Sequence, residues 1–114
     1  MAAIDIVKKH YESLGTRSIR VPEWDNLEIF VRPFTLGEQS ELYQIQMDPK
    51  RSQFDLYAAT IALKARDANG TRLFSDADIK QLMGYADQVV IERVATEIVE
   101  VSKVDDLKKS SETT

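Results

Sequence analysis

The stretch SIRVPEWDNLEIFVRPFTLGE, residues 18–38, contains the two local patterns that decide the fold. Apolar and polar residues alternate on both sides of residues 22–26, and this two-residue period is typical of two half-buried strands. The intervening residues favour a turn, and Pro22, which has no backbone N–H, suits the end or edge of a strand. Thr35 is followed three residues later by Glu38, which is the spacing of a capping box. The stretch therefore predicts a β-hairpin that leads directly into a helix beginning at Leu36.

Further helices are predicted on both sides of this stretch. The helix from Leu36 is expected to end near Met47, because Pro49 disfavours a helical residue in front of it. On the N-terminal side, apolar and aromatic positions recur every three to four residues over residues 2–14, which predicts a short helix that stops at Gly15. Residues 52–66 carry a broad apolar stripe, which predicts a central helix packed by several neighbours. The stripe consists of Phe54, Tyr57, Ala58, Ile61 and Ala65, widened by Leu56, Ala59 and Leu63.

The C-terminal third predicts two more helices after a turn at residues 67–70 and a brief extended segment at residues 71–74. Ser75 and Asp78 resemble another helix start, and Gly84 is expected to close that helix. Residues 87–103 are rich in Val and Ile, but their period is helical. The apolar positions are Ile91, Val94, Ala95, Ile98 and Val101 or Ser102.

The predicted fold is therefore α+β and mainly α-helical, with an N-terminal helix, one β-hairpin and then three to four packed helices. Residues 1–104 are expected to form a single domain, since 114 residues suffice for one domain and not for two. In residues 105–114 only Leu107 is apolar, so we expect a disordered C-terminal tail.

Composition argues against several classes of partner. With 15 Lys and Arg against 19 Asp and Glu, the net charge of −4 is unsuited to nucleic acid, which requires a clustered basic surface. No apolar run approaches the ~18 residues of a membrane span, and the N-terminus lacks the pattern of a secretory signal. The absence of cysteine excludes disulfides and thiolate metal sites and is expected of a chain in a reducing compartment.

No pattern of catalytic or metal-binding residues is found in the sequence. His10 is the only histidine, and in a predicted surface helix it is expected to be solvated or partly packed. Asp76 and Asp78 lie in the first turn of a predicted helix, where negative charge is stabilised by the helix dipole. Asp67 and the glycine at position 70 do not have the spacing of a calcium loop. We therefore predict no catalytic residue, no metal, no cofactor and no enzymatic activity.

Two aromatic residues are the main candidates for a contact surface. Trp24, the sole tryptophan, falls in the predicted turn, and Phe30 points away from the strand face that carries Ile29 and Val31. The alternative is that a neighbouring element covers both. Phe34 and Val101 complete the set of interaction candidates, although the apolar period of the last helix would serve a core as well as a subunit interface.

The order of these segments resembles the small tail assembly chaperones of long-tailed bacteriophages, in particular the lambda-like phages with non-contractile tails. The resemblance covers roughly residues 19–101 and lies in IRVPEW (19–24), IFVRPFT (29–35), the Ala-rich central helix and DANGTRLFSDADI (67–79). It implies a protein of the host cell cytoplasm that is not an enzyme. Such a protein binds the apolar-rich, helical tape measure protein, keeps it soluble and helps recruit the major tail protein.

The resemblance also implies a homo-oligomer, in the form of a ring or spiral, and a second, longer product made by a programmed ribosomal frameshift. Lys108 and Lys109 are the candidate position for the slip, if a run of adenines encodes them. The alternative function is a structural head-tail joining or tail-completion protein, and a small hydrolase or metal-dependent enzyme is a third hypothesis.

Overall fold

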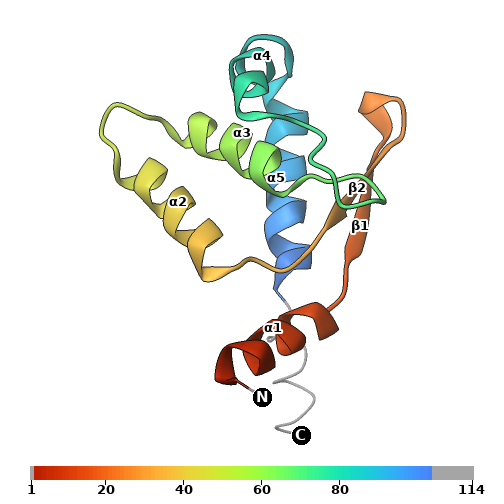
Figure 1. The fold of residues 1–114 in the computed structure, drawn as a ribbon. Helices are drawn as coiled ribbons and strands as arrows, with labels where there is room; N and C mark the ends of the chain where they lie inside the picture. Colours follow the sequence, from red (N-terminus) through yellow and green to blue (C-terminus); the bar gives the residue numbers. More distant parts are fainter. Residues whose placement is uncertain (1, 104–114) are drawn as a thin grey trace, which may run out of the picture.

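The computed structural model describes residues 2–103, and within that range it contains five α-helices and one antiparallel hairpin (Figure 1). The elements in chain order are α1 (Ala3–Ser13), β1 (Arg17–Val21), the 3-10 helix η1 (Pro22–Trp24), β2 (Leu27–Val31), α2 (Leu36–Met47), α3 (Gln53–Lys64), the 3-10 helix η2 (Asp76–Asp78), α4 (Ile79–Tyr85) and α5 (Gln88–Ser102). The predicted α+β, mainly helical fold is confirmed. The predicted tail at residues 105–114 and the frameshift position at Lys108 and Lys109 lie outside the described residues.

The hairpin places one row of side chains in the core. Ile19 pairs with Ile29 across the two strands, and Val21, Ile29 and Val31 are buried. The chain reverses through η1, after which Asp25 and Asn26 adopt positive φ angles of 56° and 55°. Asp and Asn tolerate this left-handed conformation better than most residues, so the turn composition suits the turn geometry. Among the described residues, β1 pairs only with β2, and its other edge carries no strand.

The core lies where α3 and α5 pack together against the hairpin (Figure 1). Ile61 of α3 and Ile98 of α5 are fully buried, and Val94 meets the strand residues in the same cluster. Burial of each such side chain contributes about 1.5–3 kcal/mol to folding. The central position predicted for α3 is confirmed, since it also contacts α2, α4 and η2.

Three helix starts carry capping boxes, and those at Thr35 and Ser75 were predicted. Thr35 and Glu38 form a complete capping box at α2, and Ser52 and Asp55 form another at α3. The box at Ser75 opens η2, which continues into α4. Because each box satisfies backbone N–H groups that a helix cannot satisfy itself, these starts are set by a few neighbouring residues.

Two predicted helix ends were wrong. We expected the central helix to reach Arg66, but α3 ends at Lys64. The backbone of Arg66 instead exchanges hydrogen bonds with that of Phe30, at N···O distances of 2.8 and 3.1 Å, which requires an extended chain. Gly84 does not close α4, which runs on to Tyr85. The predicted turn at residues 67–70 is present, and Gly70 takes a positive φ of 86° there.

A lysine is buried at the C-terminal end of α3. The Lys64 side chain is only 2% exposed, and its Nζ lies 2.8 Å from Glu38 Oε1 and 3.2 Å from the carbonyl oxygen of Pro33. The same ammonium lies 4.8 Å from the centre of the Phe34 ring. Burial lowers the pKa of Lys64, and the carboxylate of Glu38 opposes that change. The pair joins the end of α3 to the first turn of α2.

Candidate interaction surfaces

An apolar groove surrounds Trp24 at the tip of the hairpin. The ring of Trp24 is half-buried and meets the ring of Phe74 edge to face, with centroids 6.1 Å apart. The groove has a volume of about 550 Å³, and Tyr85, which is 88% exposed, stands at its rim. Its main apolar lining residues are Trp24, Leu27, Leu73, Phe74, Leu82 and Ala86. This groove contains the first of the predicted interaction residues.

The hairpin tip is held in place by an ion pair to α5. Both guanidinium nitrogens Nη1 and Nη2 of Arg93 donate to the carboxylate of Glu23, the residue before Trp24. These hydrogen bonds lower the pKa of Glu23 from 4.5 to about 2. A two-point contact of this kind fixes direction as well as distance, so it orients the turn that carries Trp24.

A second apolar groove lies on the other side of α4. It has a volume of about 290 Å³ and shares Leu82 and Ala86 with the groove around Trp24. Its rim carries Phe54 and Met83, both of which are exposed. We call the two together the α4 grooves. An exposed apolar surface that is continuous over two grooves is typical of a protein contact site.

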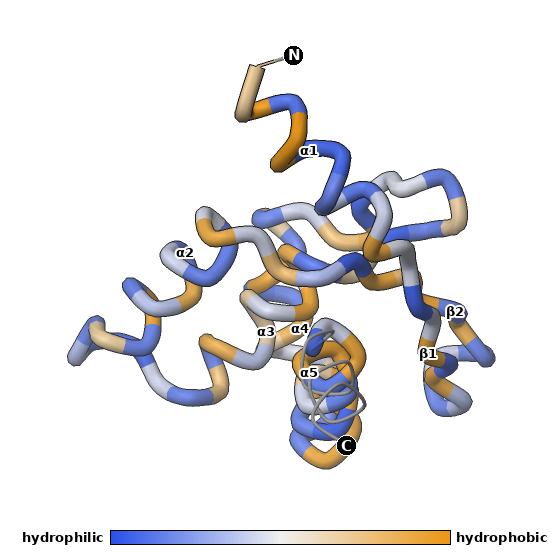
Figure 2. Tube along the Cα trace, turned by 90° about the horizontal axis from the view of Figure 1, so that it is seen from below, coloured by the Kyte–Doolittle hydropathy of each residue, from blue (hydrophilic) through white to orange (hydrophobic). Residues whose placement is uncertain are grey.

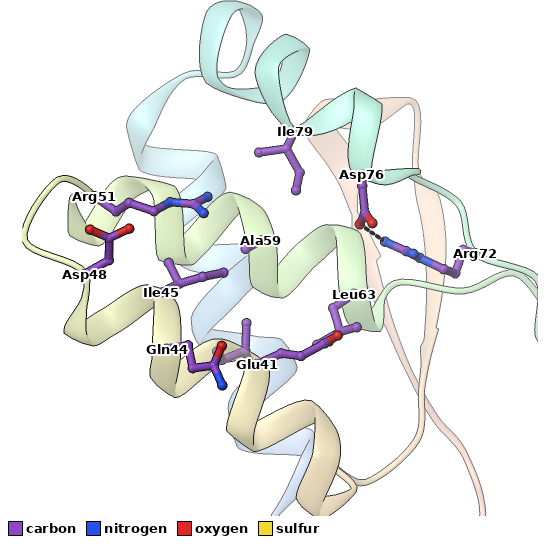
Figure 3. A pocket seen from close by; sticks show the side chains of 11 residues that line it. Glu41, Gln44, Ile45, Asp48, Arg51, Ala59, Leu63, Arg72, Asp76 and Ile79 are labelled. Carbon is purple, nitrogen blue, oxygen red and sulfur yellow. Dashed lines mark hydrogen bonds and ion pairs between the residues drawn. The ribbon is translucent and has the colours of Figure 1, made fainter.

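A third groove, between α2 and α3, has a more polar lining (Figure 3). Its volume is about 510 Å³, and apolar side chains such as Ile45 and Leu63 point into it. At the edge near η2, Arg72 pairs with Asp76 at 2.9 Å. The other charged or polar lining residues are Glu41, Gln44, Asp48 and Arg51. This mixture suits a ligand with both apolar and charged groups, in contrast to the apolar α4 grooves.

The N-terminal helix exposes apolar side chains to solvent. No residue of α1 is buried, and Ile4, Ile6 and Val7 are each more than half exposed. Figure 2 shows α1 projecting from the rest of the described chain. Its contacts to the body run through Tyr11, whose hydroxyl donates to the Pro33 carbonyl. A helix of this length is marginal by itself in water, so its apolar side chains are available for a partner.

The other predicted interaction residues do not join Trp24. Phe30 is half-buried in a separate cleft on the far side of the hairpin, and Phe34 is half-buried between the ends of α1, α2 and α5. Val101 packs against the core at the end of α5, although it remains partly exposed. The four residues are therefore distributed over three surfaces and the edge of the core.

Several residues of the α4 grooves were not among the predicted candidates. Leu82 and Met83 lie in the helix that was predicted to start after Ser75, but Phe74 and Tyr85 carried no signal of their own. A short amphipathic helix followed by an exposed tyrosine could have indicated this surface. The pairing of Phe74 with Trp24 joins residues 50 positions apart, and the sequence does not give that contact.

The described residues contain no group of three or more His, Cys, Asp and Glu side chains that could hold a metal ion. His10 is exposed on α1. Within residues 2–103, the helices are all too short or too polar to cross a membrane.

Comparison with known proteins gives a match of fold. No family model matches the sequence, and no curated protein sequence matches it. Among solved structures, the tail assembly chaperone of bacteriophage HK97 is similar, with a TM-score of 0.59 over 75% of this chain and 79% of that chain. The two sequences are 14% identical, so the likeness concerns the fold. The fold thus resembles that of a phage tail assembly chaperone, as the sequence patterns had indicated.

Proposed function

We propose that this protein is a tail assembly chaperone of a long-tailed, lambda-like bacteriophage, acting in the host cell cytoplasm. In this proposal it binds the tape measure protein, keeps it soluble during tail assembly and helps recruit the major tail protein through a longer, frameshifted product. It acts by binding alone, without a catalytic step. The observation that carries the proposal is the fold shared with the HK97 tail assembly chaperone, combined with the exposed apolar α4 grooves.

The α4 grooves have the chemistry that an apolar helix requires. An amphipathic helix presents side chains at spacings of three and four residues, and grooves lined by Leu, Phe and Trp accept such side chains. Their combined lining is mainly apolar, so release of water from both partners favours binding. A net charge of −4 keeps the free chain soluble despite this exposed surface.

Self-association is the second part of the proposal. A long client requires many weak sites in a row, and a ring or spiral of identical chains supplies them. The exposed Ile4 and Val7 of α1 are the residues we assign to the contact between copies. Replacement of both by serine should shift the sedimentation of the purified chain toward the monomer, while its melting temperature stays nearly constant. If the unmodified chain already sediments as a monomer, the self-association part of the proposal is refuted.

The client-binding part is tested by co-expression with the tape measure protein of the same genome. We expect the client to become soluble and to co-purify with the chain. The double variant Met83→Ser/Tyr85→Ser should lose this effect, because both side chains are exposed on α4. The matched control is Tyr43→Ser/Met47→Ser, which removes an exposed tyrosine and an exposed methionine of α2, outside the α4 grooves.

If both double variants lose client solubilisation equally, or if the unmodified chain has no effect on client solubility, the assignment of the client site to the α4 grooves is refuted.

Detection of the chain in finished particles would instead indicate a structural head-tail joining or tail-completion protein. The frameshift part fails if the gene has no slippery heptamer near the codons of Lys108 and Lys109 and no overlapping downstream frame.

A further inference from the structure

A cleft of about 640 Å³ lies on the side of the hairpin that faces away from the core. Its walls come from four parts of the chain. Helix α1 supplies Tyr11, strand β2 supplies Phe30, and Arg32 follows directly after that strand. Helix α2 supplies Glu38, and the segment after α3 supplies Arg66. Lys64 and the loop of residues 67–70 complete it. The cleft shares no lining residue with the α4 grooves, so its role is independent of the proposed client surface.

The cleft concentrates positive charge in an otherwise acidic chain. Three cations line it, at Arg32, Lys64 and Arg66, against two carboxylates. Of these carboxylates, Glu38 is engaged by Lys64 and by the backbone N–H of Thr35. The other, Asp67, accepts two backbone N–H groups of its own loop, at 2.8 and 3.0 Å. Neither carboxylate makes an ion pair with Arg32 or Arg66.

Arg32 and Arg66 both lie within electrostatic reach of Lys64. Burial is the main cause that lowers the pKa of Lys64, but the charges of Arg66 and Arg32 lower it further. Like charges held this close repel each other, and the repulsion is stronger where water is partly excluded. An anion in the cleft would relieve it.

The guanidinium of Arg32 is poorly satisfied by the described residues, so its Nη donors can serve a ligand in the cleft. It lies 4.9 Å from the centre of the Tyr11 ring, and its Nη2 makes only a long contact of 3.5 Å to the Tyr11 carbonyl. Its Nε is buried and has no hydrogen-bond acceptor among the described residues. Buried donors without an acceptor are rare, because they lose their bond to water and gain nothing in return. Arg66 uses Nη1 for the Gly70 carbonyl, which leaves its other N–H groups available.

We infer that this cleft binds a carboxylate, presented by an acidic peptide segment of a partner protein, through Arg32 and Arg66. A carboxylate accepts two parallel hydrogen bonds from one guanidinium, and such pairs are short and strong. The aromatic walls at Tyr11 and Phe30 suit the methylene groups of a Glu or Asp side chain. A phosphate group fits less well, because its larger charge would meet Glu38 and Asp67 at close range.

The test is a titration of the full-length, ¹⁵N-labelled chain with a capped hexaglutamate peptide at low salt. We expect saturable shifts of the backbone signals of residues that line the cleft. A capped hexaglutamine peptide should give no such shifts, and inorganic phosphate should bind at least tenfold more weakly. If phosphate binds as well as or better than hexaglutamate, the assignment to a carboxylate is wrong.

Variants identify the residues that carry the binding. Arg66→Gln and Arg32→Gln should each weaken hexaglutamate binding about tenfold or more, in line with the loss of a charged hydrogen-bonded pair. Arg32→Lys keeps the charge and should still weaken binding, which covers the case in which Arg32→Gln fails to fold. The matched control is Arg51→Gln, an exposed arginine of another groove, which should leave binding unchanged. Absence of saturable shifts, or equal weakening by Arg51→Gln, would overturn the inference without affecting the proposed client site.

Discussion

Replacement of Glu38 by glutamine should strongly destabilise the fold, because it leaves the buried ammonium of Lys64 without a counter-charge. Glutamine preserves the capping box, since its amide oxygen can still accept from the Thr35 N–H, which now lies 3.0 Å from Glu38 Oε1. The change therefore removes the ion pair and little else. This isolates the electrostatic contribution of the pair from the contribution of the helix cap.

The magnitude follows from the burial of the two partners. Loss of one partner of a fully buried pair costs about 3–5 kcal/mol. Here Lys64 is 2% exposed but Glu38 is 18% exposed, and the ammonium retains the Pro33 carbonyl and the Phe34 ring. We therefore expect Glu38→Gln to lower the free energy of unfolding by about 2–3 kcal/mol. For a chain of this length that corresponds to a fall in melting temperature of about 8–15 °C.

A double-mutant cycle measured by urea unfolding checks the origin of this loss. Lys64→Met removes the ammonium while keeping a flexible side chain of similar length. The Glu38 carboxylate that remains is 18% exposed and still accepts from the Thr35 N–H, so the free energy of unfolding should fall by only about 1–2 kcal/mol, less than for Glu38→Gln. In the Lys64→Met background, Glu38→Gln should have almost no effect. The coupling energy should therefore exceed about 1.5 kcal/mol. If Glu38→Gln lowers the free energy of unfolding by the same amount in the wild-type and Lys64→Met backgrounds, the ion pair does not stabilise the fold and the reasoning is refuted.

The same variant has an expected pH dependence. Glu38 raises the pKa of Lys64 against the effect of burial, so Glu38→Gln should lower the folded-state pKa further below its ordinary value of 10.5. The unfolded chain then binds more protons than the folded variant in the alkaline range below 10.5, and stability rises with pH there. The stability difference between wild type and Glu38→Gln should therefore shrink as pH is raised from neutrality. A difference that is constant with pH would contradict this account.

Three further predictions concern single residues. Trp24→Ala should lower the free energy of unfolding, measured in urea titrations, by about 2–3 kcal/mol. This is less than for a fully buried core residue, because the ring is half-buried against Phe74. A decrease below about 0.5 kcal/mol would show that the ring does not pack against the fold. Arg93 holds the pKa of Glu23 at about 2, so the stabilising effect of Glu23 is present above its ordinary pKa of 4.5 and lost as pH falls toward 2. Melting temperatures of wild type and Glu23→Gln should differ at neutral pH and converge at the acid end; curves that stay parallel would contradict the pairing. Gly70→Ala should lower the free energy of unfolding, measured by thermal unfolding, by about 1–2 kcal/mol. A φ of 86° is strained for alanine, even though no atom lies within 4 Å of the added Cβ. An unchanged melting temperature would show that the loop adapts.

The parts of the fold that were predicted correctly depend on neighbours in the sequence. The capping box of Thr35 and Glu38 involves residues three positions apart, and α2 has the expected bounds. The alternation in residues 18–31 likewise specifies the hairpin, because a shift by one residue would expose Ile29 and Val31. Signals of this kind are complete within a few residues, so they can be read without knowledge of the rest of the chain.

The end of α3 could not be predicted in this way. Helical propensity continues through Ala65, but the backbone of Arg66 is hydrogen-bonded to that of Phe30, 36 positions earlier. Burial of Lys64 depends on the same long-range arrangement, since Glu38 and Pro33 come from other elements. A lysine in the last turn of a helix normally indicates an exposed residue stabilised by the helix dipole. Tertiary contacts override that local preference here.

The candidate site was predictable in part. Trp24 could be selected because a large aromatic residue in a turn is unusual, and the structure places it in an apolar groove. The residues that form the groove with it come from the segment before η2 and from α4, and only the fold brings them together. Phe30 was correctly assigned to the face opposite Ile29, but the arginines that surround it gave no recognisable motif.

Within residues 2–103 one edge of β1 is unpaired, which has a consequence for the behaviour of the chain at high concentration. An open row of backbone N–H and C=O groups is a template for strand addition, and growth along it leads to insoluble aggregates. Strand β1 is only five residues long and contains Arg17 and Arg20, both exposed. Two copies brought together edge to edge would bring these like charges close together, which opposes sheet extension. The hairpin can therefore remain at the periphery of a crowded assembly without initiating fibre growth.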